Sequence, residues 1–118
     1  ESNPLTLFLA SIDKFLALPE DTLTLPSHGK PFTGLHRRIA QLHAHHRDRL
    51  AEVMEACAQK ACSAADIVPI MFKRELDLHQ MTFAMGEAVA HLHALWFEGR
   101  LRRRLSNVGI WVFEPTLR

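Results

Sequence analysis

The chain has 118 residues, of which 47% are hydrophobic and 23% charged, a size and balance typical of one globular domain. Its net charge of +1 argues against a strongly basic protein built to bind polyanions. No apolar run approaches the roughly 20 residues that span a bilayer, and no secretory signal pattern is present. Two cysteines without CxxC spacing fit a reducing compartment. We therefore expect a cytoplasmic protein with no membrane partner, and the missing initiator methionine leads us to expect a fragment of a longer chain.

The first apolar pattern predicts a helix over residues 4–18 and then a short strand. Asn3 is expected to cap this helix and Pro19 to end it. Residues 22–25 are β-prone, and because a single strand is not stable alone, its partner strands are expected outside this chain. The helix is expected either to fold back on the rest of the chain or to be buried in a homodimer. Its apolar face is formed by Leu5, Phe8, Leu9, Ile12, Phe15 and Leu16.

A long second helix is predicted from Gly34 to about Lys60, with Thr33 or Gly34 as its cap. Its apolar positions step by three and four without a break: Leu35, Ile39, Leu42, His46, Leu50, Val53, Cys57 and Ala61. The opposite face carries mixed charges, which is typical of a face exposed to solvent.

Several histidines and both cysteines are predicted to have structural roles. His46 lies on the apolar stripe and is expected to be a hydrogen-bonded core or boundary residue, although its spacing from His43 also permits a metal chelate. His91 and His93 are two residues apart in a helix and therefore point to different faces. His36, His45 and His79 are expected at surface or cap positions, and Cys57 and Cys62 as small buried hydrophobic residues.

Two further helices and a hairpin complete the pattern. Ser63 and Asp66, three residues apart, predict the cap of a helix that Pro69 should kink. The fourth helix runs from residue 78 or 79 to Glu98, and Gly99 ends it. Residues 101–105 and 110–113 predict strands around a turn at 106–109. The predicted fold class is therefore mainly α with a small β-hairpin (α+β), in the element order of a winged-helix domain.

Two features of the fourth helix carry separate expectations. Gly86 costs helix stability of up to about 1 kcal/mol relative to alanine, which predicts a close helix–helix approach at this position. A stripe of large residues is expected to pack in the core, with a ligand pocket as the alternative: Met81, Met85, Trp96 and Phe97.

The segment that joins the two kinds of sequence contains a histidine on stiff backbone. In the sequence Leu-Pro-Ser-His-Gly-Lys-Pro-Phe at residues 25–32, the prolines restrict φ and Gly29 permits a tight turn or close backbone approach. Such a loop at a strand end can position His28 as a ligand or catalytic side chain. The simpler interpretation is an ordinary surface histidine.

Together with the basic amphipathic helix that follows it, Ser-Ala-Ala-Asp at 63–66 and Gly-Glu-Ala-Val-Ala-His-Leu at 86–92, this segment resembles one family. It is similar to the C-terminal end of metallo-β-lactamase-fold hydrolases of the glyoxalase II-like and ribonuclease-like branch, which carry a winged-helix appendage. The resemblance covers nearly the whole chain. It implies that residues 1–33 are the last helix and strand of an αββα metallohydrolase core, and that residues 34–118 are a winged-helix-like domain.

The resemblance also implies a metal ligand. The family's usual motif here is Pro-Gly-His-Gly, whose histidine is the last ligand, on the second zinc, and His28 is the equivalent residue although Ser27 stands where glycine is common. The family's His-x-His-x-Asp-His motif is not in this chain. Because a catalytic zinc needs about three protein ligands, this chain alone is expected to hold no catalytic residues, to bind no zinc and to be inactive.

The parent protein implied by the resemblance is a zinc hydrolase. Two divalent ions would activate a bridging water and polarise the scissile bond of a small thioester or ester, or of RNA. The implied partners of this chain are the rest of the metallohydrolase domain and, for the piece alone, a second copy. In the parent, the appendage is expected to pack beside the active site and shape substrate access.

The alternative function is nucleic-acid binding by a winged-helix module. Its candidate residues form a basic wing: Arg100, Arg102, Arg103 and Arg104. Arg102 and Arg104 share one face of the predicted strand. The simpler interpretation is an edge strand kept soluble by charge, and the presumed recognition helix over residues 78–95 has no lysine, arginine or asparagine to read bases.

Overall fold

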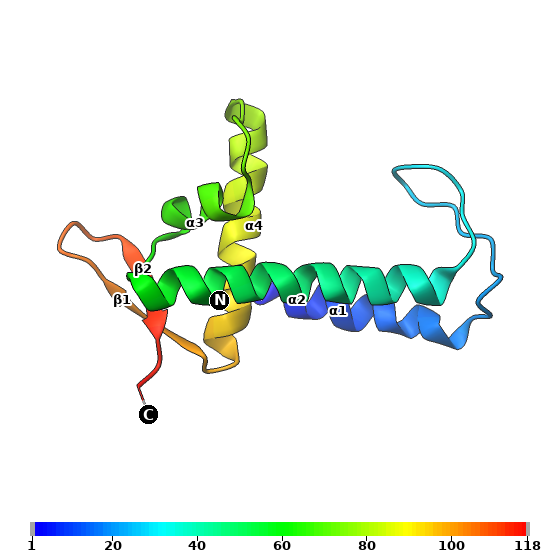
Figure 1. Cartoon of the computed structure of the whole chain (residues 1–118), viewed down its shortest axis with the longest axis horizontal. Helices are drawn as coiled ribbons and strands as arrows, with labels where there is room; N and C mark the ends of the chain where they lie inside the picture. The colour runs from blue at the N-terminus through cyan, green and yellow to red at the C-terminus, as the bar shows by residue number, and fades with distance from the viewer. Residues whose placement is uncertain (1, 118) are drawn as a thin grey trace.

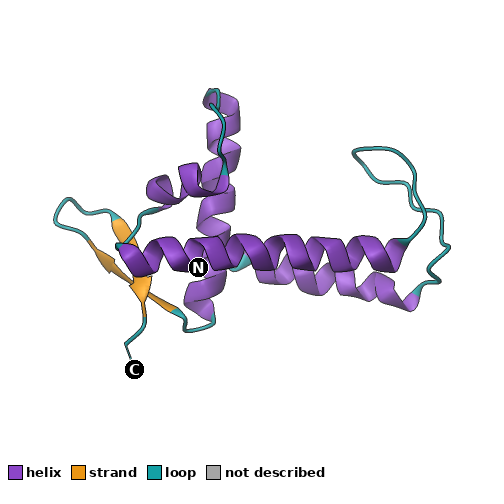
Figure 2. Ribbon diagram, in the orientation of Figure 1, coloured by secondary structure: helices purple, strands orange, loops and turns teal. Residues whose placement is uncertain are grey.

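The computed structural model describes residues 2–117, which form four α-helices and one two-stranded antiparallel sheet (Figures 1 and 2). In chain order these are α1 (Pro4–Asp13), the 3₁₀ helix η1 (Lys14–Ala17), α2 (Leu35–Gln59), α3 (Ala64–Met71), α4 (Leu78–Phe97), β1 (Leu101–Leu105) and β2 (Trp111–Pro115). The predicted mainly helical α+β fold class is confirmed.

The other elements of the molecule are arranged along helix α2 (Figure 1). It is 25 residues long, α1 runs beside it, and α4 crosses it, as Figure 1 shows. The sheet lies at the C-terminal end of α2, whereas the loop over residues 18–34 lies at its N-terminal end. The molecule is consequently elongated, with extents of 53 × 37 × 24 Å.

The hydrophobic core lies where α2, α3, α4 and the sheet meet. Its fully buried members include Val53 of α2, Ile67 of α3, Leu92 and Leu95 of α4, and Leu101 of β1. Complete burial of such a side chain stabilises the fold by roughly 1.5–3 kcal/mol. Of the apolar stripe predicted for α2, Val53 and Cys57 belong to this core and Leu50 packs against it, and from α4 the core includes Ala88 as well.

The sheet is tied to the end of α2 through Cys62. The N–H of Cys62 donates to the carbonyl of Phe113 at 3.0 Å, and the N–H of Phe113 donates to the carbonyl of Cys62 at 2.8 Å. Within the sheet, β1 and β2 pair antiparallel from Leu101↔Pro115 to Leu105↔Trp111. The second strand runs from Trp111 to Pro115, whereas residues 110–113 were predicted, and the N–H of Ser106 donates to the carbonyl of Ile110 at 2.8 Å across the turn.

The helix ends show how well local signals predict structure. Ser63 and Asp66 form the predicted capping box of α3, each side chain accepting from the other's backbone N–H. Gly99 ends α4 as predicted, with φ at +76°. Asn3, by contrast, makes no side-chain cap at α1, and its side-chain oxygen is buried without a hydrogen-bond partner, so that prediction was wrong.

Two predictions for α4 need correction. Gly86 is exposed, and a Cβ built on it would meet no atom within 4 Å, so the predicted close helix–helix approach does not occur there. The small residues of α4 that are buried in the core are Ala84 and Ala88. Of the large-residue stripe, Met85 and Trp96 pack against the core, whereas Met81 and Phe97 remain exposed and are not core residues.

Helix α1 contacts α2 and α4 but buries little of its apolar surface. Leu5 is its one buried residue. Leu9 and Ile12 are half-buried. The other large apolar side chains of α1 and of the segment after it are exposed: Leu7, Phe8, Phe15, Leu16, Leu18, Leu23 and Leu25. The part of the chain that precedes α2 thus presents many of its apolar side chains to solvent.

Candidate functional site

His28 lies in the middle of a loop that closes on itself between Thr24 and Phe32. The N–H of Thr24 donates to the carbonyl of Phe32 at 2.8 Å, and the N–H of Phe32 donates to the carbonyl of Thr24 at 3.0 Å. This single bridge replaces the predicted strand, and the expectation that its partners lie only outside the chain was wrong. The chain can reverse within so few residues because Gly29 adopts φ of +101°.

His28 itself is exposed and, within residues 2–117, has no hydrogen-bond or ion-pair partner. Nor do any three histidine, cysteine, aspartate or glutamate side chains of these residues come together closely enough to hold a metal ion. The donors of this chain therefore do not fit a complete zinc site, which needs about three protein ligands. The assignment of His28 as a metal ligand stays a prediction.

The loop is anchored to α2 by Glu20, a residue that the sequence patterns did not single out. Its carbonyl accepts from the N–H of Gly34 and Leu35 at 3.1 and 3.4 Å, and its Oε1 accepts from the N–H of His36 at 2.8 Å. The ring of His36 in turn bonds the carbonyl of Leu18 at 2.7 Å. A helix that begins at glycine lacks a side-chain cap of its own, and this was the signal that an acceptor from elsewhere would supply one.

A pair of imidazoles, of which His91 is buried and His46 partly buried, lies where α2 crosses α4. Nδ1 of His91 is 2.7 Å from the carbonyl oxygen of Glu87, and because a carbonyl can only accept, this nitrogen carries the proton. Nε2 of neutral His91 then accepts from Nδ1–H of His46 at 3.4 Å. Burial, and then the neighbouring His91, lowers the pKa of His46, and burial also lowers the pKa of His91. The prediction that His46 is a hydrogen-bonded boundary histidine is confirmed.

The other expectations for this group of residues are resolved by their contacts. His43 lies 2.6 Å from Oδ1 of Asp13 on α1, so it does not form a chelate with His46. His93 faces the sheet, with its ring 6.2 Å from that of Phe113, whereas His91 faces α2, as their spacing predicted.

Both cysteines are buried, as predicted. Burial, followed by the adjacent Cys62, raises the pKa of the Cys57 thiol to about 12, and burial also raises the pKa of Cys62. Because the thiolate is the reactive form, neither residue is suited to act as a nucleophile at neutral pH.

The arginines of β1 are held by neighbouring side chains. Glu114 of β2 accepts from Arg102 at 3.0 Å and from Arg104 at 2.8 Å, and these two bonds, Arg104 first, lower the pKa of Glu114. The guanidinium of Arg103 lies between two indole rings, and Arg100 is 3.7 Å from Glu98. Because Arg100, Arg102 and Arg104 already pair with carboxylates, they make a poor phosphate-binding surface, and the geometry does not favour the nucleic-acid alternative.

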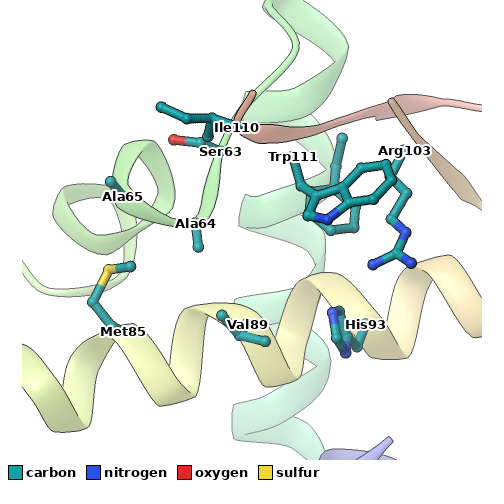
Figure 3. Close-up of a pocket in the computed structure, with 10 residues that line it drawn as sticks. Ser63, Ala64, Ala65, Met85, Val89, His93, Arg103, Ile110 and Trp111 are labelled. Atoms are coloured by element: carbon teal, nitrogen blue, oxygen red, sulfur yellow. The ribbon is translucent and has the colours of Figure 1, made fainter. Parts of the chain in front are cut away.

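A cavity of about 360 Å³ lies between α3, α4 and the sheet (Figure 3). Its lining is mainly apolar, with a histidine and an arginine at one end. Figure 3 labels Ser63, Ala64, Ala65, Met85, Val89, His93, Arg103, Ile110 and Trp111, and Phe113 completes the lining. The sequence predicted a pocket only as the alternative role of the methionine stripe. Of that stripe, Met85 lines this cavity.

Among residues 2–117, no helix is both long and apolar enough to cross a membrane.

These observations define the chain as a helical domain with a small sheet that carries, in its described residues, an exposed histidine but no complete metal centre. The model of the family described as "Metallo-beta-lactamase-like, C-terminal domain" matches residues 50–116, and the chain belongs to this family. A comparison with curated proteins found no match.

Two solved structures show where such a domain occurs. A β-lactamase domain protein from Burkholderia ambifaria is 56% identical to this chain, with a TM-score of 0.95, over 98% of this chain and 34% of that protein. A metallo-β-lactamase family protein from Thermus thermophilus is 26% identical, with a TM-score of 0.81, over 98% of this chain and 35% of that protein. The chain thus spans about a third of the length of the solved proteins it matches.

Proposed function

We propose that this chain is the C-terminal part of a metal-dependent hydrolase of the metallo-β-lactamase superfamily and that His28 is one ligand of its metal centre. The observation that carries the proposal is the similarity of 98% of the chain to about a third of a β-lactamase domain protein, in agreement with the family match. Because this chain covers 34% of that protein, about two thirds of such a protein could supply the remaining metal ligands.

The position of His28 supports this role. Its imidazole is exposed on a loop closed by the Thr24–Phe32 bridge and is not bonded to any other residue in the described range 2–117. A neutral imidazole in this state keeps one nitrogen for a metal and the other for an orienting hydrogen bond. The exposed apolar residues that precede α2 lie on the same part of the chain and would pack against the catalytic domain.

In detail, the proposal keeps the division of the chain at residues 33 and 34. Residues 1–33 would complete a metallohydrolase core that binds two zinc ions, and residues 34–118 would form a winged-helix-like appendage that shapes substrate access. The glyoxalase II-like or ribonuclease-like branch implies a small thioester or ester, or RNA, as substrate. The chain alone lacks the other ligands and is expected to be inactive.

The test uses the longer protein with His28→Ala. Because losing a ligand weakens metal binding at least as much as losing a residue that only orients a ligand, we expect metal affinity and hydrolytic rate to fall together by about tenfold or more. Metal content by elemental analysis and hydrolysis of thioester, ester and RNA substrates are the two measurements. His79→Ala, an exposed histidine on α4, is the matched control and should change neither. Unchanged metal stoichiometry in His28→Ala would remove this residue from the site.

A further inference from the structure

The cavity between α3, α4 and the sheet has the size and composition of a small-molecule site. Ligand sites typically start at about 300 Å³ and combine an apolar lining with a few polar groups, and this cavity of about 360 Å³ does so. It lies at the sheet end of α2, whereas the His28 loop follows from the opposite end, as Figure 1 shows. It is therefore separate from the proposed metal centre.

The polar end of the cavity is held rigidly. The guanidinium carbon of Arg103 lies 3.9 Å from the ring centre of Trp96 and 4.2 Å from that of Trp111. Stacking on both faces fixes the guanidinium plane and directs its N–H donors outward along the edge. Because a guanidinium has five N–H donors, Arg103 can bind a carboxylate and keep another partner at the same time.

His93 adds a second polar group beside Arg103, and Figure 3 shows its ring pointing toward that side chain. Nδ1–H of His93 donates to the backbone carbonyl of Ser2 at 3.1 Å. The ring packs edge-on against Trp96 at 5.5 Å. An orienting bond and aromatic packing together hold this ring in place.

The rest of the cavity offers only apolar contacts. Met85 and Val89 of α4 form one wall, Ala64 and Ala65 of α3 a second, and Ile110 with Trp111 the third (Figure 3). Ile110 and Trp111 are 51% and 44% exposed, so a ligand can enter from solvent between them and α4. A hydrocarbon body fits this end and a charged group does not.

We propose that this cavity binds a small monocarboxylic acid, with the carboxylate on Arg103 and the hydrocarbon chain along Met85 and Val89. A bidentate guanidinium–carboxylate pair is among the stronger charge-assisted hydrogen bonds, and its fixed plane lowers the entropic cost of forming it. The proposal does not depend on any metal and applies to the 118-residue chain itself.

Tryptophan fluorescence provides the test, because the two tryptophans of the chain are the two that flank Arg103. The chain is titrated with octanoate and, separately, with octanol. We expect a saturable change with octanoate at a midpoint about tenfold lower than with octanol, the difference being the carboxylate pair. Equal midpoints for the two probes, or a response to octanoate that does not saturate, would overturn the proposal.

Three variants separate recognition from general hydrophobic binding. Val89→Phe fills the cavity at a partly exposed position and should weaken both probes about tenfold or more. Arg103→Gln should raise the octanoate midpoint to that of octanol. Arg104→Gln, on the opposite face of the same strand, is the matched control and should leave both midpoints unchanged. An unchanged octanoate midpoint in Val89→Phe would place the binding elsewhere.

Discussion

At the scale of single residues, the imidazole pair at the crossing of α2 and α4 makes stability depend on pH. Burial lowers the pKa of both His46 and His91 below 6.5 in the folded protein. The unfolded chain therefore binds these protons first as pH falls, and the stability present above about pH 6.5 is lost at lower pH. Glu87 favours the charged form of His91 and partly opposes this loss, whereas His45 and Arg49 add to it.

We predict that His46→Asn reduces this acid sensitivity. Asparagine keeps a donor at the place of Nδ1–H but does not titrate. Between about pH 7 and 5, the free energy of unfolding of His46→Asn should therefore fall less steeply than that of the unsubstituted chain. Urea unfolding at several pH values measures it. His79→Asn, on the exposed first turn of α4, should keep the parental slope. If the free energy of unfolding of His46→Asn fell with pH as steeply as that of the unsubstituted chain, the pair of His46 and His91 would not be the source of the acid sensitivity.

At the scale of elements, the end of α4 depends on a left-handed glycine. The N–H of Arg100 donates to the carbonyl of Leu95 and the N–H of Gly99 to that of Trp96, both at 3.0 Å, which is a Schellman ending. This ending turns the chain from α4 into β1 and so sets the position of the whole sheet. It requires φ of +76° at Gly99, a conformation that other residues adopt at a cost.

We predict opposite effects for alanine at two glycines of this region. Gly99→Ala should destabilise the chain by about 1–2 kcal/mol through left-handed strain. Gly86→Ala, in the exposed middle of α4 where a Cβ meets nothing within 4 Å, should stabilise it by about 0.5–1 kcal/mol. Equilibrium unfolding of both variants gives the two values. Destabilisation by Gly86→Ala would mean that the α4 surface has a contact in solution that this structure lacks.

Local signals predicted most elements because each had a physical cause within a few residues. The apolar stripe of α2, the Ser63–Asp66 box and the glycine end of α4 are of this kind. The capping box between Asp77 and Gln80 was equally local and was readable from their spacing, although it was not predicted. The glycine at the start of α2 indicated that a cap would come from elsewhere, but Glu20 could not be identified as its source, because it lies 16 residues from His36 in sequence.

At the scale of the whole molecule, the site residues show the same limit. His28 was found through a motif, and its exposure on a closed loop is compatible with that prediction without testing it. The Trp96–Arg103–Trp111 stack was not predicted, since it joins three elements whose packing is decided by the shared core. Residue identity therefore indicated chemistry, whereas the placement of side chains from distant elements required the fold.

The exposed apolar surface of α1 and η1 predicts self-association of the isolated chain. Burying side chains such as Phe15 and Leu16 between two copies removes apolar area from water, at roughly 25 cal/mol per Å². We expect sedimentation velocity to show a dimer whose fraction rises with concentration. Leu7→Lys combined with Leu16→Lys should shift the chain to monomer, whereas Leu78→Lys, an exposed leucine on α4, should not. If the unsubstituted 118-residue chain stayed monomeric at high concentration, this expectation would be contradicted.

The unbroken length of α2 has a mechanical consequence. A straight helix of 25 residues is a stiff rod of about 37 Å, joined to Glu20 near one end and followed closely at the other by the Cys62–Phe113 bridge to the sheet. A small tilt of this rod at its sheet end becomes a larger displacement at its far end, in the way that a lever works. The orientation of the His28 imidazole therefore depends on how the sheet packs against the opposite end of α2.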